Sequence, residues 1–133
     1  MSKKFKVKLV TAEKPYFDDE CVELQVPAYD GMMGVMHDHA PFVTKLGTGI
    51  AIVKVDDGKV QKFAMQNGFI QIAENDVTVL AERIATVKDI KKDDLETKLS
   101  EYSEKILKSD SQENRKKTEL ELSWLKSLKT LTQ

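Results

Sequence analysis

The sequence predicts an α+β fold: an N-terminal antiparallel β-sandwich over residues 1–87, followed by a C-terminal two-helix hairpin over residues 88–133. The hydrophobic period is the first observation behind this prediction. Apolar residues alternate with polar ones up to about Thr86 and recur every three to four residues after Val87. The second observation is that neither glycine nor proline occurs after Gly68, so helices in this region are expected to run uninterrupted.

Short strands account for the first part of the chain. In segments 5–9 and 22–26, apolar side chains alternate with polar ones, as in strands with one buried face. Segments 50–55 and 60–65 flank Asp57-Gly58, a pair that favours the positive φ angles of a tight hairpin turn.

A second hairpin is expected further along the chain. Segments 69–72 and 77–80 are apolar enough to form strands, and they flank a turn candidate at residues 74–76. Strands this short and this closely spaced are typical of an antiparallel sandwich or a small barrel.

The first helix is expected to begin near Asp89, which is placed to cap it, with Asp93 and Asp94 adding negative charge to the first turn. Cap-forming residues at 109–114 then end this helix and start another. The apolar stripe of the first helix consists of Leu95, Leu99, Tyr102 and Ile106. The stripe of the second helix consists of Leu120, Trp124, Leu128 and Leu131, broadened by Leu122 and Leu125.

Neither helix can bury its stripe alone, so the hairpin must dock on itself, on the sandwich or on another molecule. A hairpin that depends on docking is a plausible mobile element. A permanently docked hairpin that completes the core is the equally weighted alternative, and the sequence does not separate the two.

The composition is that of a folded domain with an appendage. The chain has 133 residues, 41% of them hydrophobic and 32% charged, with a formal net charge of −1. Such a chain has no general electrostatic attraction to nucleic acid or anionic lipid. Cys21 is the only cysteine, and we expect a buried, unreactive thiol. We expect no signal peptide and no membrane-spanning segment, because no apolar run approaches about 20 residues.

His37 and His39 flank Asp38 in the one cluster of residue types that suits catalysis or metal binding. On an extended chain both imidazoles would project to the same face and could supply two metal ligands. No further ligand is indicated nearby, so a loop pair serving turn geometry and surface contacts is the favoured interpretation. The chain has no other histidine, and we expect neither a catalytic site nor a metal site.

Other candidate motifs have simpler explanations. No Gly-x-x-x-x-Gly-Lys-Ser/Thr loop is present to cradle a phosphate. The basic residues 115–117, Lys126 and Lys129 are interpreted as a solvated helix face, with an acidic partner as the alternative. Met32 and Met33 provide a flexible apolar surface that suits a protein contact or fills a gap in a core.

A family resemblance rests on the glycine-rich segment between the first strands. Gly31-Met-Met-Gly-Val35, His39-Ala-Pro-Phe42 and Gly47-Thr-Gly49 follow one another, and Val77-Thr-Val-Leu-Ala81 forms a later strand. With these motifs, and with a sandwich followed by two helices, the chain resembles the epsilon subunit of the F-type ATP synthase over essentially its whole length.

The resemblance implies a non-catalytic subunit of the central stalk that couples rotation to ATP synthesis in a proton-translocating complex. Such a subunit binds the gamma subunit through its sandwich and touches the ring of c subunits, so its contact with the membrane is indirect. By the resemblance, the residues that contact the ring or gamma are Gly31, Met32, Met33, His37, His39 and Phe42.

The helical tail would then be a regulatory arm that extends toward the alpha and beta subunits and inhibits ATP hydrolysis. Its residues would be Arg115, Lys116, Lys117, Trp124, Lys126 and Lys129, with Trp124 interpreted as an anchor between the two helices. The resemblance also implies a peripheral position on the cytoplasmic face of the bacterial inner membrane.

The chain departs from the family pattern at its contact loop and at its tail. His37-Asp38 stands where many relatives carry Pro-Gly, and Met32 stands where an acidic residue is common. Some relatives bind ATP through an Ile-Asp-x-x-Arg-Ala motif. In the corresponding segment here, Lys91 replaces the aspartate and Asp94 replaces the arginine.

The second helix lacks arginines at the matching positions too. Lys117-Thr118 stands where those relatives have Arg-Ala, and Trp124 stands where they have another arginine. Because these guanidinium groups would hold phosphate, we expect no strong ATP binding by the isolated subunit and no cofactor.

Two alternatives to the stalk subunit remain open from the residues. The first is a stand-alone β-sandwich interaction module that self-associates through its helical hairpin. The second is a small metal-dependent enzyme that uses His37 and His39. Neither accounts for the loop motifs, the strand order and the helical tail together.

Overall fold

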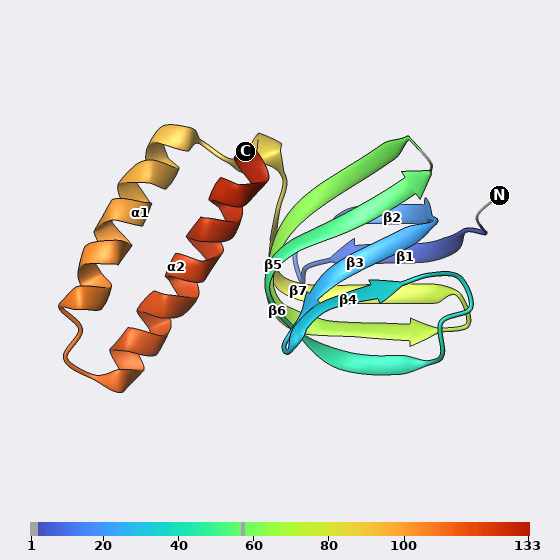
Figure 1. Ribbon diagram of the computed structural model, residues 1–133, viewed down its shortest axis with the longest axis horizontal. Coiled ribbons are helices and arrows are strands. Elements are labelled where there is room, and N and C mark those ends of the chain that lie inside the picture. The colour runs from blue at the N-terminus through green and yellow to red at the C-terminus, as the bar shows by residue number, and fades with distance from the viewer. Residues whose placement is uncertain (1–2, 57) are drawn as a thin grey trace.

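The computed structural model describes residues 3–56 and 58–133. A sheet of seven strands precedes two helices (Figure 1), which confirms the α+β prediction. The strands are β1 (Phe5–Val10), β2 (Pro15–Cys21), β3 (Glu23–Ala28), β4 (Gly31–Val35), β5 (Phe42–Asp56), β6 (Lys59–Ala73) and β7 (Asp76–Ala85). A 3₁₀ turn, η1 (Val87–Asp89), leads to the helices α1 (Lys92–Leu107) and α2 (Gln112–Thr132).

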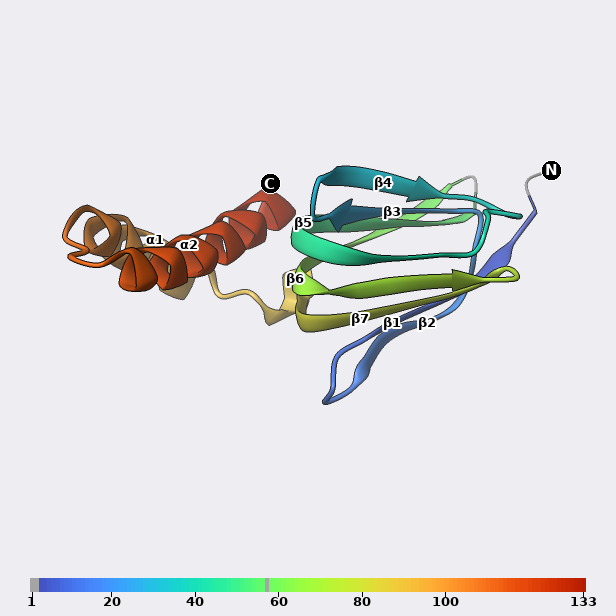
Figure 2. The same cartoon turned by 90° about the horizontal axis from the view of Figure 1, so that it is seen from below.

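The strands are hydrogen-bonded in the order β2-β1-β7-β6-β5-β3-β4. Figure 2 shows β3 and β4 in one layer and β7, β1 and β2 in the other, with β5 and β6 between them. Leu9, Leu24 and Ile70 are fully buried in the core. Phe17 of β2 meets Phe63 of β6 edge to face, with ring centroids 6.3 Å apart, so contacts between the layers close the sandwich.

The sheet is largely antiparallel, as predicted, but β1 and β7 run parallel to each other. Alternation of apolar and polar residues reports which face of a strand is buried and carries no information on strand direction. The two strands lie at opposite ends of the sandwich sequence, so no hairpin turn connects them or reveals their pairing.

The strands expected at 60–65 and 69–72 form one bent strand, β6, and the one expected at 50–55 belongs to the longer β5. Pairing of β5 with β6 skips Gly47 on one strand and Asn67 on the other. Both Asn67 and Gly68 have positive φ angles, 54° and 129°. This paired bend takes both strands through the two layers.

Both predicted hairpins exist. Asp56 pairs with Lys59 at the first, although Asp57 itself lies outside the described residues. At the second, Glu74 and Asn75 have φ angles of 45° and 63° between paired strand ends, as in a two-residue type I′ turn.

Helix α1 begins at Lys92, so the prediction that Asp89 caps it is wrong. The Asp89 carboxylate accepts hydrogen bonds from the Thr86 backbone N–H at 2.9 Å and from the Thr86 hydroxyl at 3.1 Å, which stabilises η1. The break between the helices is confirmed, because the Ser111 hydroxyl accepts a hydrogen bond from the Asn114 N–H at 3.2 Å and caps α2.

Cys21 is fully buried at the end of β2. Burial raises the pKa of its thiol from 9.0 to about 11. The thiol therefore stays protonated near neutral pH, in keeping with the unreactive cysteine expected from the sequence.

Gly68→Ala is expected to lower the free energy of unfolding by about 3 kcal/mol or more. The added Cβ would lie 1.9 Å from the Leu80 carbonyl oxygen, at a φ of 129°. Gly34→Ala is the matched control, because a Cβ at Gly34 meets nothing within 4 Å. The control should change stability by no more than about 0.5 kcal/mol. Urea unfolding followed by circular dichroism compares the variants, and equal stabilities would contradict the role assigned to Gly68.

Candidate partner-binding surfaces

Large apolar side chains lie on the outside of the sandwich, on the sheet face turned away from the core. Phe69 and Leu80 are neighbours across β6 and β7, and they are 52% and 48% exposed. Val43 on β5 is 62% exposed, and it lines a shallow depression with Tyr29 and Phe69. We call these four residues the outer apolar face. Apolar clusters of this kind on a folded protein mark contact surfaces.

The outer apolar face was not predicted from the sequence, although a signal for it exists. A strand with one buried face carries polar residues on its other face. Leu80 follows the buried Val79, and Phe69 precedes the buried Ile70, so each places an apolar residue at an outward position. An apolar residue at a position where the alternating pattern requires a polar, outward-facing one would have indicated this face.

The loop between β4 and β5 lies at the end of the sandwich away from the helices (Figure 1). The His37 Nδ1 lies 3.1 Å from the Asp38 carboxylate, and the His39 Nδ1 lies 2.7 Å from the Ala40 carbonyl oxygen. Asp38 has a φ of 65°, so the chain between the histidines is not extended as the two-ligand hypothesis required. Within the described residues, no three His, Cys, Asp or Glu side chains gather in a metal-binding arrangement.

The residues predicted to contact the ring or gamma are divided between the two ends of β4. Gly31, Met32 and Met33 belong to this edge strand, where Met32 is 57% exposed and Met33 packs partly against the core. His37 and His39 lie in the loop that follows the strand. Phe42 is 46% exposed at the start of β5, with its ring centroid 6.4 Å from that of His39. The structure thus brings the His39 and Phe42 rings together at the loop end.

The helical hairpin is docked on the sandwich through α2, which lies between α1 and the strands (Figure 1). Ile50, Ala64 and Ala85 form one row across β5, β6 and β7. They pack in one apolar cluster with Trp124 and Leu125 of α2, which are 8% and 3% exposed. Two alanines in the row let the helix approach the sheet closely, and Trp124, which was interpreted as an anchor between the two helices, packs in the cluster that contains this row.

Polar contacts reinforce this docking along one turn of α2. The Gln66 side-chain amide donates hydrogen bonds to the Leu120 carbonyl oxygen at 2.7 Å and to the Thr48 hydroxyl at 3.2 Å. The Arg83 guanidinium pairs with the Glu121 carboxylate at 2.7 Å. It also lies over the Trp124 ring, 5.2 Å from the ring centroid. Strands β6 and β7 thus hold the helix by directional contacts as well as by apolar burial.

The apolar stripe predicted for α2 is partly wrong at its first member. The Leu120 side chain is 48% exposed, whereas Leu122 is buried. Because α2 contacts α1 on one side and strands on the other, it buries two faces rather than one stripe.

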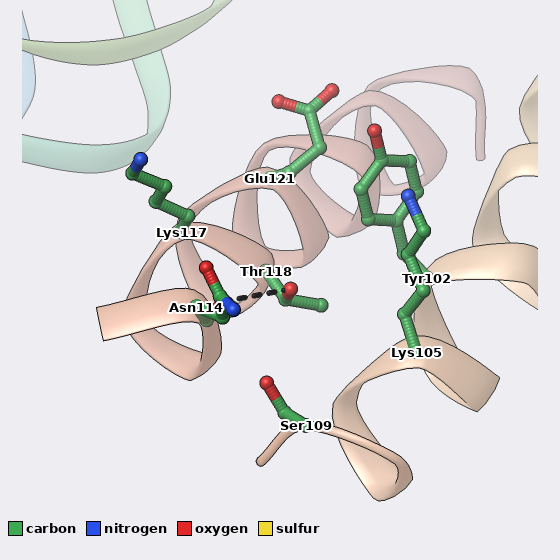
Figure 3. Close-up of a pocket in the computed structure, with 7 residues that line it drawn as sticks. All are labelled: Tyr102, Lys105, Ser109, Asn114, Lys117, Thr118 and Glu121. Atoms are coloured by element: carbon green, nitrogen blue, oxygen red, sulfur yellow. Dashed lines mark hydrogen bonds between the residues drawn. The ribbon is translucent and has the colours of Figure 1, made fainter. Parts of the chain in front are cut away.

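The predicted basic residues of the arm are all exposed. Lys117 lines a groove between α1 and α2, together with Tyr102, Lys105 and Glu121 (Figure 3). Lys129 lines another depression beside α1. Lys116 and Lys126 are exposed outside these depressions, and Arg115 lies 3.7 Å from the Glu119 carboxylate.

A depression of about 290 Å³ lies where α1, α2 and β7 meet. Its charged side chains are three cations and three carboxylates: Arg83, Lys91, Lys98, Asp89, Asp94 and Glu121. Arg83 is already engaged by Glu121 at 2.7 Å. The depression therefore offers no excess positive charge to a polyphosphate.

None of the helices in the described part of the chain is long and apolar enough to cross a lipid bilayer.

A family model matches the sandwich part of the chain, and curated relatives match most of its length. Residues 4–87 match the family described as the ATP synthase Delta/Epsilon chain, beta-sandwich domain. The ATP synthase epsilon chain of Mesorhizobium japonicum is 31% identical over 128 residues, which cover 96% of this chain and 95% of the relative. That of Sinorhizobium fredii is 35% identical over 101 residues, covering 76% and 75%.

Solved structures share the fold at lower identity. A chain in the mitochondrial ATP synthase of Euglena gracilis, in an OSCP/F1/c-ring structure, aligns with a TM-score of 0.85 at 20% identity, covering 98% of this chain and 82% of that one. A chain in the central stalk/c-ring structure of the Tetrahymena thermophila mitochondrial enzyme aligns with a TM-score of 0.71 at 14% identity, covering 99% and 98%. The family match and the near full-length relatives place this chain in the family of ATP synthase epsilon chains, the non-catalytic epsilon subunits of the F-type central stalk.

Proposed function

We propose that this chain couples rotation to ATP synthesis by binding the gamma subunit through the outer apolar face. The observation that carries the proposal is the exposure of Val43, Phe69 and Leu80 on adjacent strands of an epsilon-family sandwich. Burial of such side chains against a partner is favourable by about 1.5–3 kcal/mol each. The chain itself performs no chemistry and needs no cofactor for this role.

The loop end is proposed to face the ring of c subunits. It carries the exposed Met36 and Phe42 beside His39, and it lies away from the docked hairpin, so both features can be engaged at once. Because the predicted contact residues lie at two ends of β4, only those in the loop are proposed to contact the ring. Met32 is exposed on the edge strand β4 and is proposed to contact a neighbouring surface of the stalk.

The hairpin is proposed to be a regulatory arm with a docked and an extended state. The docked state depends on one face of α2, which would leave the sheet when the arm extends toward the alpha and beta subunits. Exposed cations such as Lys116 and Lys126 suit acidic segments of those subunits, and the extended arm would inhibit ATP hydrolysis.

As part of this complex, the chain is proposed to lie peripherally on the cytoplasmic face of the bacterial inner membrane, in a proton-translocating enzyme. The bacterial source of its relatives supports this location. Its contact with the membrane would be indirect, through the ring.

Phe69→Asp is expected to weaken binding to the cognate catalytic core that contains gamma but lacks this subunit by about 100-fold, because a charge would be buried in the contact. Val60→Asp is the matched control. Val60 is equally exposed on β6, at 52%, but lies outside the outer apolar face. Titration of the labelled chain measures both affinities. Undiminished binding by Phe69→Asp would mean that gamma does not bind the outer apolar face. A chain that self-associates and does not bind the core would favour the stand-alone interaction module.

Removal of residues 88–133 should raise the ATPase rate of the reconstituted complex about two- to tenfold, if the inhibited state is one-half to nine-tenths populated. The sandwich core is a separate cluster from the docking cluster, so the truncated sandwich keeps its packing. Leu125→Ala should act in the opposite direction and lower the rate, because the cavity destabilises the docked state by about 2–4 kcal/mol.

Trp124 is the only tryptophan, so its fluorescence quenching by acrylamide reports undocking directly. Leu107→Ala is the control for Leu125→Ala, since Leu107 is 85% exposed at the end of α1. Rates unchanged by both the truncation and Leu125→Ala, with Trp124 exposed in the latter, would mean that the arm has no inhibitory role.

The isolated chain is proposed not to bind ATP strongly, because the charges of the depression beside Arg83 balance and Arg83 is already paired. Titration calorimetry should give a dissociation constant of about 1 mM or weaker. The Asp94→Arg variant, which would line the depression with four cations and two carboxylates, should bind more tightly. Micromolar affinity of the unaltered chain would contradict the proposal.

A further inference from the structure

Asp38 and Asn75 join two turns at the loop end of the sandwich. The Asp38 backbone N–H donates a hydrogen bond to the Asn75 side-chain oxygen at 2.6 Å, and the Asn75 side-chain amide donates one to the Asp38 carboxylate at 3.1 Å. Residues 37 positions apart thus exchange two hydrogen bonds across the gap between the β4–β5 loop and the β6–β7 turn. We call this pair the clasp.

Both partners of the clasp have backbone conformations that L-residues rarely adopt. Asp38 has a φ of 65° and Asn75 a φ of 63°. Asparagine and aspartate tolerate this region better than other residues, especially when their side chains make local hydrogen bonds. The reciprocal hydrogen bonds offset the free-energy cost of the positive φ angle at Asp38. The clasp therefore stabilises this backbone conformation and is more than a chance contact between surface residues.

The framework holds the Asn75 side of the clasp. Asn75 is the second residue of the two-residue turn between β6 and β7, and its carbonyl oxygen accepts a hydrogen bond from the Lys6 N–H of β1 at 2.9 Å. Because β6, β7 and β1 hold Asn75 in place, the hydrogen bonds of the clasp restrict the motion of Asp38. The Asp38 carboxylate also lies 3.1 Å from the His37 Nδ1.

The exposed contact residues lie on the loop side of the clasp. The His39 N–H donates to the Met36 carbonyl oxygen at 3.2 Å, and the His39 ring lies beside that of Phe42. Met36 is 59% exposed and Phe42 is 46% exposed. Among the hydrogen bonds of the described residues, only the two of the clasp join residues 36–41 to another part of the chain.

We propose that Asn75 is a positioning residue for the ring contact: through Asp38, it holds Met36, His39 and Phe42 in their binding arrangement before the partner arrives. This inference rests on the proposed function of the loop end. A loop that is ordered in advance loses less conformational freedom on binding, so the clasp acts on affinity although Asn75 itself need not touch the partner.

Asn75→Gly tests the proposal without breaking the turn, because glycine keeps the positive φ and removes only the carboxamide. Glu74→Gly is the matched control. It changes the adjacent turn residue, which also has a positive φ of 45°, and it leaves the clasp intact. Asp38→Gly and Asp38→Gly/Asn75→Gly complete a double-mutant cycle.

The first measurement is amide hydrogen exchange on the full chain alone. Asn75→Gly should speed exchange in residues 36–42 about tenfold with an unchanged melting temperature, whereas Glu74→Gly should leave this segment as in the parent. Exchange that is the same in both variants and the parent would overturn the proposal, whatever the loop binds.

The second measurement is affinity for the detergent-solubilised cognate complex depleted of this subunit, with and without its c ring. Asn75→Gly should weaken binding to the ring-containing complex about tenfold and leave binding to the ring-free core unchanged. The double variant should bind no more weakly than Asn75→Gly. Faster loop exchange with unchanged affinity for the ring-containing complex would overturn the positioning role.

The parent chain separates this outcome from failure of the proposed function. If the parent binds the ring-containing and ring-free complexes equally, the loop makes no ring contact, and both proposals fall. If the parent distinguishes the complexes but Asn75→Gly binds like the parent, only the role of Asn75 is overturned.

Discussion

The paired bend of β5 and β6 is the constraint on which the rest of the structure depends. Only a residue without a side chain fits at Gly68, where a Cβ would overlap the Leu80 carbonyl oxygen. The bend lets the two longest strands take part in both layers, so a single hydrogen-bonded sheet encloses the core. It also places Gln66, the one buried polar side chain among the described residues, directly before the bend and facing α2. Closure of the sandwich and docking of the arm thus share one local cause.

The arm docks through an apolar contact that would accept many helix faces and through polar contacts that require particular positions on α2. The row of Ile50, Ala64 and Ala85 would accept many apolar helix faces, since hydrophobic burial has no directional requirement. Gln66 and Arg83 add direction, because each bonds to a particular position on α2. If the helix undocked, Gln66 would be exposed to water and could keep its bond to the Thr48 hydroxyl, so its amide would not lose every partner. Such an interface can be specific and still separate at moderate cost.

Local patterns in the sequence predicted the two helices, both hairpins and the break between the helices, because these depend on neighbouring residues, but they predicted neither β4 nor a separate β2. The parallel pairing of β1 with β7 and the continuity of β6 could not be predicted, since they depend on contacts between distant segments. The role of Asp89 could not be predicted from the sequence either. Its capping side chain lies close to the start of α1 but stabilises the preceding 3₁₀ turn. Among the site residues, the proximity of His39 to Phe42 follows from their sequence separation. The outer apolar face and the link from Asp38 to Asn75 required the fold.

The two ends of the sandwich differ in how they are held, and the difference suits different tasks. At the loop end, short-range hydrogen bonds tie two turns to the strand framework, so the loop has one preferred shape. At the other end, α2 is held by the row of Ile50, Ala64 and Ala85 and by a few polar contacts, so under the proposed regulatory role an alternative partner would replace the sheet. The proposed function needs both properties, because torque would pass through a contact that does not yield, whereas regulation would require a contact that does. The bend at Gly68 reconciles them, since it lets the arm dock beside the core without taking part in it.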